Sequence, residues 1–124
     1  MYCLRENIEY EIESEKSNKD LNLFSVYMKD ISQYKRLTPE EEFNLGVRIC
    51  EGDLEARDLL VMHNLKFVVF IANEYSHDIV SLLDIIQFGN EGLMIAANKF
   101  NPYMGVRFSS FASYYIKQRI SRGI

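Results

Sequence analysis

The feature that most constrains the fold of this chain is the segment from residue 51 to residue 76, EGDLEARDLLVMHNLKFVVFIANEYS. Its apolar residues are too dense for a surface helix, which carries only one apolar stripe. We therefore expect the segment to form the buried centre of an all-α fold. Asp53 is a suitable cap for its start. The pattern fits either one long helix or two helices that join near Asn64.

Two segments before this centre also have helical periodicity. Residues 21–34, LNLFSVYMKDISQY, place apolar side chains at steps of three and four, which predicts a helix with one apolar face. Residues 37–43, LTPEEEF, predict the start of a second helix. Thr38 is its expected cap, Pro39 suits its first turn, and Glu41 completes a capping box.

The second half of the chain predicts two more helices. One is opened by Ser81 and ends before the turn sequence NPYMG. The last begins at Ser109 or Ser110 and runs to the chain end. Together these helical segments predict a compact all-α domain of about four to five helices over residues 21–124. Residues 1–20 before it are predicted to form an acidic flexible leader. Helical spacing places these apolar residues in or beside the core: Leu60, Phe67, Val68, Ile71, Ile85, Leu93, Ile116 and Ile120.

Size and composition exclude several classes of protein. A chain of 124 residues suits one domain, and no apolar run approaches the ~20 residues of a membrane span. Its acidic start is unlike a signal peptide, so we expect a cytoplasmic protein with no membrane partner. Cys3, Cys50, His63 and His77 have no metal-ligand spacing, and no phosphate loop or nucleophile motif is present. We therefore expect no metal, no cofactor and no enzymatic activity.

Charge is segregated along the chain. Residues 1–98 carry nine Lys and Arg against eighteen Asp and Glu, whereas residues 99–124 carry five Lys and Arg and no acid. The net charge of −4 hides this difference. A basic segment in an acidic protein indicates a local anionic partner. Its basic residues are Lys99, Arg107, Lys117, Arg119 and Arg122.

The last predicted helix has two different faces. At 100° per residue, Ala112, Ile116 and Ile120 lie on a core side. The opposite face combines rings, an amide, a hydroxyl and a guanidinium: Phe111, Tyr114, Tyr115, Gln118, Ser121 and Arg122. Such a face can stack unpaired bases and bind base edges and phosphate. It is equally compatible with packing on another helix, and periodicity leaves both interpretations open.

The helix before it is also two-sided. Its core side is formed by Leu82, Ile85, Leu93, Ala96 and Phe100. Gly89 and Gly92 allow another backbone to approach closely. A second side gathers Asp84, Gln87, Asn90, Glu91 and Met94. This polar stripe fits either a solvated surface or a protein-binding surface.

Four pieces of the sequence, in this order and at this spacing, resemble the sigma-70 family of bacterial RNA polymerase sigma factors. They are LFSVYMKDISQYKRLTPEEEFNLGVRICEGD, HNLKFVVFIANEY, LLDIIQFGNEGLMIAANKF and GVRFSSFASYYIKQRISRGI, which cover nearly the whole chain. The resemblance implies an all-helical sigma-factor core domain. It also implies a transcription initiation factor that binds core RNA polymerase and recognises and melts the minus-ten promoter element.

The resemblance also implies two sets of site residues. The clamp helices of the polymerase's largest subunit would be bound by Asp84, Gln87, Phe88, Asn90, Glu91 and Met94. Promoter DNA, mainly its non-template strand, would be bound at several positions. The aromatic melting surface corresponds to Phe108, Phe111, Tyr114 and Tyr115. The upstream edge of the element would meet Gln118, Ser121 and Arg122, and the downstream unpaired bases would meet Asn64 and Ser110. The basic segment would add Lys99, Arg107 and Lys117.

The sequence departs from the family pattern at several of these positions. Phe88 stands where the clamp-binding helix is usually acidic. Tyr114 and Tyr115 replace a tryptophan pair, which makes the wedge at the duplex fork smaller. Tyr103 and Met104 replace basic residues, which weakens phosphate contact there.

Two other functions fit part of the pattern. The family continues beyond the position of Ile124 into domains that read the upstream promoter, so a short form could act as a sigma-like interaction module. Such a module would bind polymerase or an anti-sigma protein without opening promoters. An unrelated helical RNA-binding protein is the second alternative, but it would not explain the polar stripe that includes Gln87.

Overall fold

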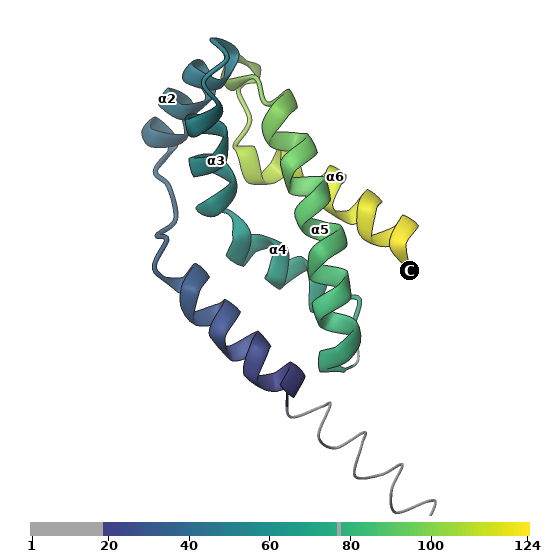
Figure 1. Ribbon diagram of the computed structural model, residues 1–124. Helices are drawn as coiled ribbons and strands as arrows, with labels where there is room; N and C mark the ends of the chain where they lie inside the picture. Colours follow the sequence, from purple (N-terminus) through teal and green to yellow (C-terminus); the bar gives the residue numbers. More distant parts are fainter. Residues whose placement is uncertain (1–18, 77) are drawn as a thin grey trace, which may run out of the picture.

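The computed structural model describes residues 19–76 and 78–124, which form helices joined by turns and by an extended linker before α2 (Figure 1). A first helix covers residues 19–32 and is followed by α2 (Pro39–Cys50), α3 (Leu54–Met62), α4 (Leu65–Ala72), α5 (Ile79–Lys99), the 3₁₀ turn η1 (Pro102–Met104) and α6 (Phe108–Gly123). The described residues contain no strand, which confirms the all-α prediction. Most of the predicted acidic leader lies outside the described residues, and residues 19 and 20 are already helical.

Neither a membrane-spanning helix nor a metal-binding cluster occurs among residues 19–76 and 78–124. No helix there combines the length and the apolar character needed to cross a bilayer. No group of three or more His, Cys, Asp or Glu side chains in the same residues is arranged to hold a metal ion.

Helix α2 begins with the predicted capping box. The Thr38 hydroxyl accepts a hydrogen bond from the Glu41 backbone N–H at 3.2 Å, and the Glu41 carboxylate accepts one from the Thr38 N–H at 3.2 Å. Helix α3 begins in a similar way, because Asp53 Oδ1 accepts a hydrogen bond from the Ala56 N–H at 3.2 Å. Its other oxygen accepts one from Arg48 Nε at 2.9 Å. Both helix starts are therefore encoded by local sequence, as predicted.

Both cap carboxylates make folding stability depend on pH. Hydrogen bonds from the Thr38 backbone and side chain hold the pKa of Glu41 below its usual value, and those from Ala56 and Arg48 do the same for Asp53. A carboxylate with a depressed pKa stabilises the fold above the unfolded-state pKa, and this contribution is lost as pH falls through the folded-state pKa.

We expect the melting temperature to fall on acidification below about pH 4.5, the ordinary glutamate value. Thermal melts of an E41Q, D53N double variant should show a shallower fall, because both amides can still cap but cannot titrate. An identical slope in both proteins would contradict this.

The dense segment after Asp53 forms two helices rather than one. Helix α3 ends at Met62 and α4 begins at Leu65. Between them, the Asn64 side-chain amide donates a hydrogen bond to the Leu60 carbonyl at 2.7 Å. This bond satisfies one of the carbonyls that the end of α3 leaves free. Asn64 thus marks the division, which sequence periodicity had left open.

Two predicted helix starts are wrong by one to three residues. Helix α5 begins at Ile79 and is capped by Asp78, whose Oδ1 accepts a hydrogen bond from the Ser81 N–H at 2.8 Å. Ser81 therefore receives the cap instead of providing it. Helix α6 begins at Phe108 rather than at Ser109 or Ser110, and it has no side-chain cap from its own N-cap residue. A carboxylate from α2 supplies that cap, which local sequence could not show.

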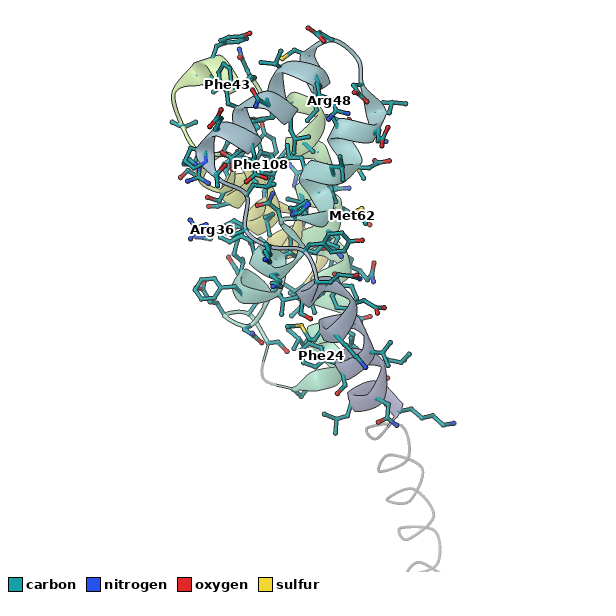
Figure 2. All side chains as sticks on the ribbon, turned by 90° about the vertical axis from the view of Figure 1, so that its left-hand side faces the viewer. Phe24, Arg36, Phe43, Arg48, Met62 and Phe108 are labelled. Carbon is teal, nitrogen blue, oxygen red and sulfur yellow. The ribbon has the colours of Figure 1, made fainter. Side chains whose placement is uncertain are left out.

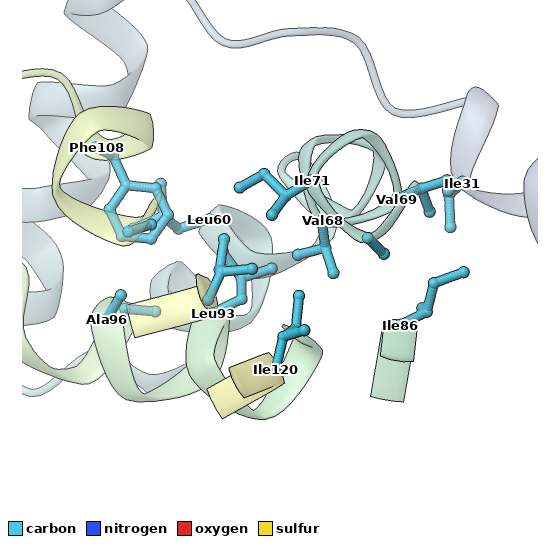
Figure 3. Packing of buried hydrophobic residues seen from close by; sticks show 14 of the residues in the cluster. Ile31, Leu60, Val68, Val69, Ile71, Ile86, Leu93, Ala96, Phe108 and Ile120 are labelled. Carbon is cyan, nitrogen blue, oxygen red and sulfur yellow. The ribbon is translucent and has the colours of Figure 1, made fainter. Parts of the chain in front are cut away.

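The core lies where α3, α4, α5 and α6 converge (Figure 3). Seven of the eight residues predicted in or beside the core are buried, and Phe67 is half-buried and packs against them. The largest fully buried side chains are Phe108, Leu60, Ile86, Leu93, Ile116, Ile120 and Val68. Ile31 of the first helix joins this cluster, so residues far apart in sequence share one core.

The backbones of α5 and α6 come close together at Gly92. A Cβ atom at that position would lie 2.8 Å from the Ile116 Cα, and Gly92 therefore has no room for any side chain. A Cβ atom on Gly89, one turn earlier, would instead lie 2.6 Å from a side-chain atom, Val68 Cγ1 of α4. The predicted close approach of another backbone is therefore confirmed at Gly92, whereas the atoms nearest to Gly89 belong to side chains of α4 and α6. Helices α5 and α6 therefore pack as one pair, which carries most residues of both predicted interfaces.

Candidate nucleic-acid and polymerase interfaces

The aromatic side chains around α6 form a series that runs from the core to solvent. The Phe100 ring lies 5.0 Å from the Phe108 ring and 6.1 Å from the Phe111 ring. The Phe111 ring lies 5.2 Å from that of Tyr115, which in turn lies 5.3 Å from that of Tyr114. Phe111 and Tyr115 are half-buried, and Tyr114 is 63% exposed. Only the outer end of the series offers a free ring face for stacking.

The structure places Phe108 in the core. Its exposed fraction is 0%, and it is among the largest fully buried side chains of the described residues. A DNA contact by this ring is therefore incompatible with the fold as it stands. The ring of Phe108 packs against that of Phe100 beneath the exposed face of α6. The predicted DNA contact would require the Phe108 ring to leave the core, and a DNA-binding role for Phe108 stays a prediction.

The basic residues of the C-terminal segment are divided between inner and outer positions. Arg107 Nε lies 3.1 Å from Glu42 Oε1, and Arg119 Nη2 lies 3.2 Å from Glu91 Oε2, so two of the five cations already have anionic partners. Lys99, Lys117 and Arg122 are exposed and make no ion pair with any described residue.

Lys99 Nζ also lies 5.4 Å from the centre of the Tyr115 ring, a cation–π geometry. The remaining polar positions of the predicted DNA set are accessible to different degrees. Ser110 and Ser121 are exposed, whereas Gln118 and Asn64 are half-buried.

A hollow of 350 Å³ lies beside the start of α6. Its walls come from the linker before α2, from the α3–α4 junction, from α4 and from Ser109. The lining residues are Tyr34, Arg36, His63, Asn64, Lys66, Phe67, Phe70 and Ser109. Arg36 extends away from the ribbon on this side of the molecule (Figure 2). The hollow therefore combines ring surfaces, an amide and two cations, which suits an unpaired nucleotide.

Sequence reasoning found only Asn64 of the residues that line this hollow. Phe70 was included in the buried centre, but it is 65% exposed. A periodic argument could have found it, since Phe70 lies 200° around the helix from Val68, on the opposite face. Arg36 gave no signal. Tyr34 was predicted on the apolar face of the helix over residues 21–34, but that helix ends at residue 32 and Tyr34 lies in the linker that follows it. Only the tertiary fold brings this linker to α4 and α6.

The polar stripe on α5 is present, but its members are not equally accessible. Asp84, Gln87 and Glu91 are exposed. Asn90 is half-buried and its amide donates a hydrogen bond to the Tyr27 hydroxyl at 3.3 Å, so it also holds the first helix. Met94 is half-buried as well. The freely accessible part of the predicted polymerase-binding set is therefore smaller and more acidic than the sequence indicated.

Phe88 lies at the edge of this stripe and faces α6. It is half-buried, and a Cβ atom built on Gly123 would lie 2.6 Å from its Cε2. The ring thus covers the last turn of α6. This contact gives Phe88 an internal role that a family-based interpretation did not show.

Comparison with known proteins identifies the class to which this helical arrangement belongs. The description "Sigma-70 region 2" matches residues 60–124, and "Sigma-70 factor, region 1.2" matches residues 23–55. The first match covers more than half of the chain, from α3 to the end of α6. The chain therefore belongs to the sigma-70 family of sigma factors. Members of this family are non-enzymatic transcription initiation factors, in agreement with the prediction that the chain is not an enzyme.

Particular relatives are the RNA polymerase sigma factors SigA of two bacteria. The chain is 40% identical to SigA of Clostridium acetobutylicum over 93% of its own length and 33% of the relative's length. It is 43% identical to SigA of Listeria monocytogenes over 80% of its own length and 26% of that relative. The chain thus spans a third or less of the curated relatives that it matches.

Proposed function

We propose that this protein acts in the cytoplasm as the part of a transcription initiation factor that binds core RNA polymerase and recognises the minus-ten promoter element. One observation carries the proposal. Helices α5 and α6, packed together at Gly92, expose two separate surfaces of opposite character. The first is acidic and amide-rich and includes Asp84 and Gln87, and the second is basic and aromatic and includes Tyr114 and Arg122.

The α6 surface is suited to an unpaired strand. An open strand exposes base faces and phosphates, and base–aromatic stacking contributes about 1–3 kcal/mol per base. Tyr114 offers the free ring, Gln118 and Ser121 can hydrogen-bond base edges, and Arg122 can bind phosphate. The 350 Å³ hollow near Asn64 could accept a second, flipped base. Trapping unpaired bases in this way offsets part of the cost of opening the duplex, and no covalent step is needed.

The α5 surface is suited to a basic protein partner. Asp84 and Glu91 provide two exposed carboxylates, of which Glu91 also lies 3.2 Å from Arg119 Nη2, and the exposed Gln87 amide lies on the same helix. Charge complementarity of this kind guides association and sets its orientation. The proposed partner surface is the pair of clamp helices of the polymerase's largest subunit.

The polymerase interface is tested by replacing its accessible residues. A D84A, Q87A double variant should bind core polymerase roughly 30-fold more weakly, since losing contacts at an interface centre costs about 2 kcal/mol. Asn90 is left intact because its bond to Tyr27 would mix stability with binding. Affinity is measured by fluorescence anisotropy of labelled protein titrated with core enzyme.

The matched control removes one acid and one amide elsewhere. Glu55 and Asn44 are exposed on α3 and α2, and an N44A, E55A double variant should bind as the wild type does. Equal affinity of D84A, Q87A and wild type would place the polymerase interface on another surface. Polymerase binding without any strand binding would instead support the interaction module, with polymerase or an anti-sigma protein as the partner.

A further inference from the structure

A buried carboxylate connects α2 to the start of the DNA-facing helix. Glu42 is 5% exposed and is the only buried charged residue among residues 19–76 and 78–124. Its Oε1 accepts a hydrogen bond from the Phe108 backbone N–H at 2.7 Å and another from Arg107 Nε at 3.1 Å. Its Oε2 accepts one from Arg107 Nη2 at 3.4 Å. A carboxylate from one helix thus caps the N-terminus of another.

The same guanidinium also holds the linker that precedes α2. Arg107 Nη2 donates a hydrogen bond to the Leu37 carbonyl at 3.1 Å. Leu37 follows Arg36, which lines the hollow beside α6. The linker, α2 and the first turn of α6 are therefore joined at one point. Ser109, in that first turn, forms another wall of the hollow.

The local sequence of α6 explains why this connection matters. Its first turn contains no acid, and its N-cap residue makes no side-chain cap. The first N–H groups of a helix need acceptors, and a negative charge there is stabilised by the helix dipole. Glu42 of α2 supplies both the hydrogen-bond acceptor and the negative charge, and the partly buried Arg107 guanidinium balances that charge. No other described side chain accepts a hydrogen bond from the Phe108 N–H, so Glu42 and the packing of the Phe108 ring on Phe100 together fix the start of α6.

We propose that Glu42 and Arg107 act as positioning residues for the DNA interface: together they set the start of α6 and the linker, and hence the shape of the hollow that receives an unpaired base. This inference rests on the proposed function. It also changes the role of Arg107, which the sequence placed among the DNA-binding residues. Its Nε and Nη2 donate hydrogen bonds to Glu42 and to the Leu37 carbonyl, so these nitrogens stabilise the fold instead of binding phosphate.

Arg107→Lys separates the two roles of Arg107. Lysine keeps the positive charge that a phosphate contact needs, but a single ammonium cannot reproduce the planar arrangement that reaches both Glu42 and Leu37. The probe is a fluorescent single-stranded oligonucleotide with a minus-ten-type sequence, titrated into the complex of full-length chain and core polymerase. We expect R107K to bind this strand at least fivefold more weakly. Its salt dependence should match that of wild type, because no phosphate contact is lost.

A double-mutant cycle tests whether the two residues act together. Glu42→Ala and Arg107→Ala should each weaken strand binding, and the double variant should be no weaker than the worse single variant, because both remove one connection. Glu42→Gln should be intermediate, since its carbonyl can still accept from the Phe108 N–H. Arg48→Lys, in the α2 ion pair with Asp53, is the control and should bind as wild type does. All variants should bind polymerase with unchanged affinity, which a general loss of structure would not allow.

A second readout reports on the hollow itself. In wild type, replacing the base that enters the hollow with an abasic site should weaken binding, and this difference should shrink in R107K. Unchanged strand affinity in R107K, or a salt slope reduced by about one in R107A, would overturn the positioning role and make Arg107 a phosphate contact. Absence of strand binding by wild type in the polymerase complex would overturn the proposed function and the positioning role together.

Discussion

A Phe108→Ala variant should lose about 3–5 kcal/mol of its free energy of unfolding, the usual cost of removing a buried phenylalanine ring. Phe108 is fully buried and packs edge-on against Phe100, with ring centres 5.0 Å apart. Its backbone N–H also receives the Glu42 cap, so a shift at this position loosens the first turn of α6. Urea unfolding followed by circular dichroism measures the loss as a lower midpoint at an unchanged slope.

Phe108→Leu distinguishes a core residue from a DNA contact. Leucine fills most of the same space and should cost less than about 1.5 kcal/mol. If the ring serves the core, strand affinity of this variant should stay within twofold of wild type. A folded F108L protein that loses strand binding would instead show that the ring leaves the core to contact DNA.

Phe108 also shows what sequence periodicity cannot reveal. Helical periodicity correctly placed Ile116 and Ile120 on the core side of α6, because a face is a property of the helix alone. It could not show what covers the first turn of α6, because Phe100 and Glu42 come from other parts of the chain. Family resemblance assigned the ring to DNA, and only the tertiary fold reveals its burial.

The predicted helix starts follow the same rule. The α2 capping box was predicted correctly, because Thr38 and Glu41 are three residues apart and complete it between themselves. The start of α6 was misplaced, since its cap lies 66 residues away in sequence. The sequence around a helix start predicts the start correctly when the capping residue lies within a few positions. It cannot do so when the cap comes from another helix.

The candidate interfaces were predictable to different extents. The α5 stripe lies on one helix, so periodicity alone gathered Asp84, Gln87 and Glu91. The hollow beside α6 takes its walls from a linker, a helix junction and two helices, so no single pattern contained it. Its cations, Arg36 and Lys66, lie in the acidic part of the sequence. The segregation of charge predicted an anionic partner only for the basic segment after residue 98, so it did not indicate these two residues.

Tyr114→Ala should weaken binding of an unpaired minus-ten strand by about 1–3 kcal/mol, or roughly 5- to 150-fold, if a base stacks on this ring. Tyr114 is 63% exposed and its ring lies edge-to-face with that of Tyr115, so its removal should change stability by less than about 0.5 kcal/mol. Phe111 differs, because its ring packs between Phe100 and Tyr115. Phe111→Ala should therefore lower both stability and strand affinity, and only Tyr114 gives a clean test of stacking.

Two further variants make the Tyr114 test specific. Tyr114→Phe keeps the ring face and should keep most of the affinity, which separates stacking from hydrogen bonding by the hydroxyl. Tyr103→Ala removes an equally exposed ring, 70% accessible, from η1 and should leave strand binding unchanged. Affinity is measured with the labelled strand in the polymerase complex at two salt concentrations. Because tyrosine carries no charge, the salt slope of Y114A should equal that of wild type, whereas Arg122→Ala should flatten it. If wild type and Y114A bind the strand with equal affinity, the Tyr114 ring only covers Tyr115, and the proposal that α6 stacks a base is rejected.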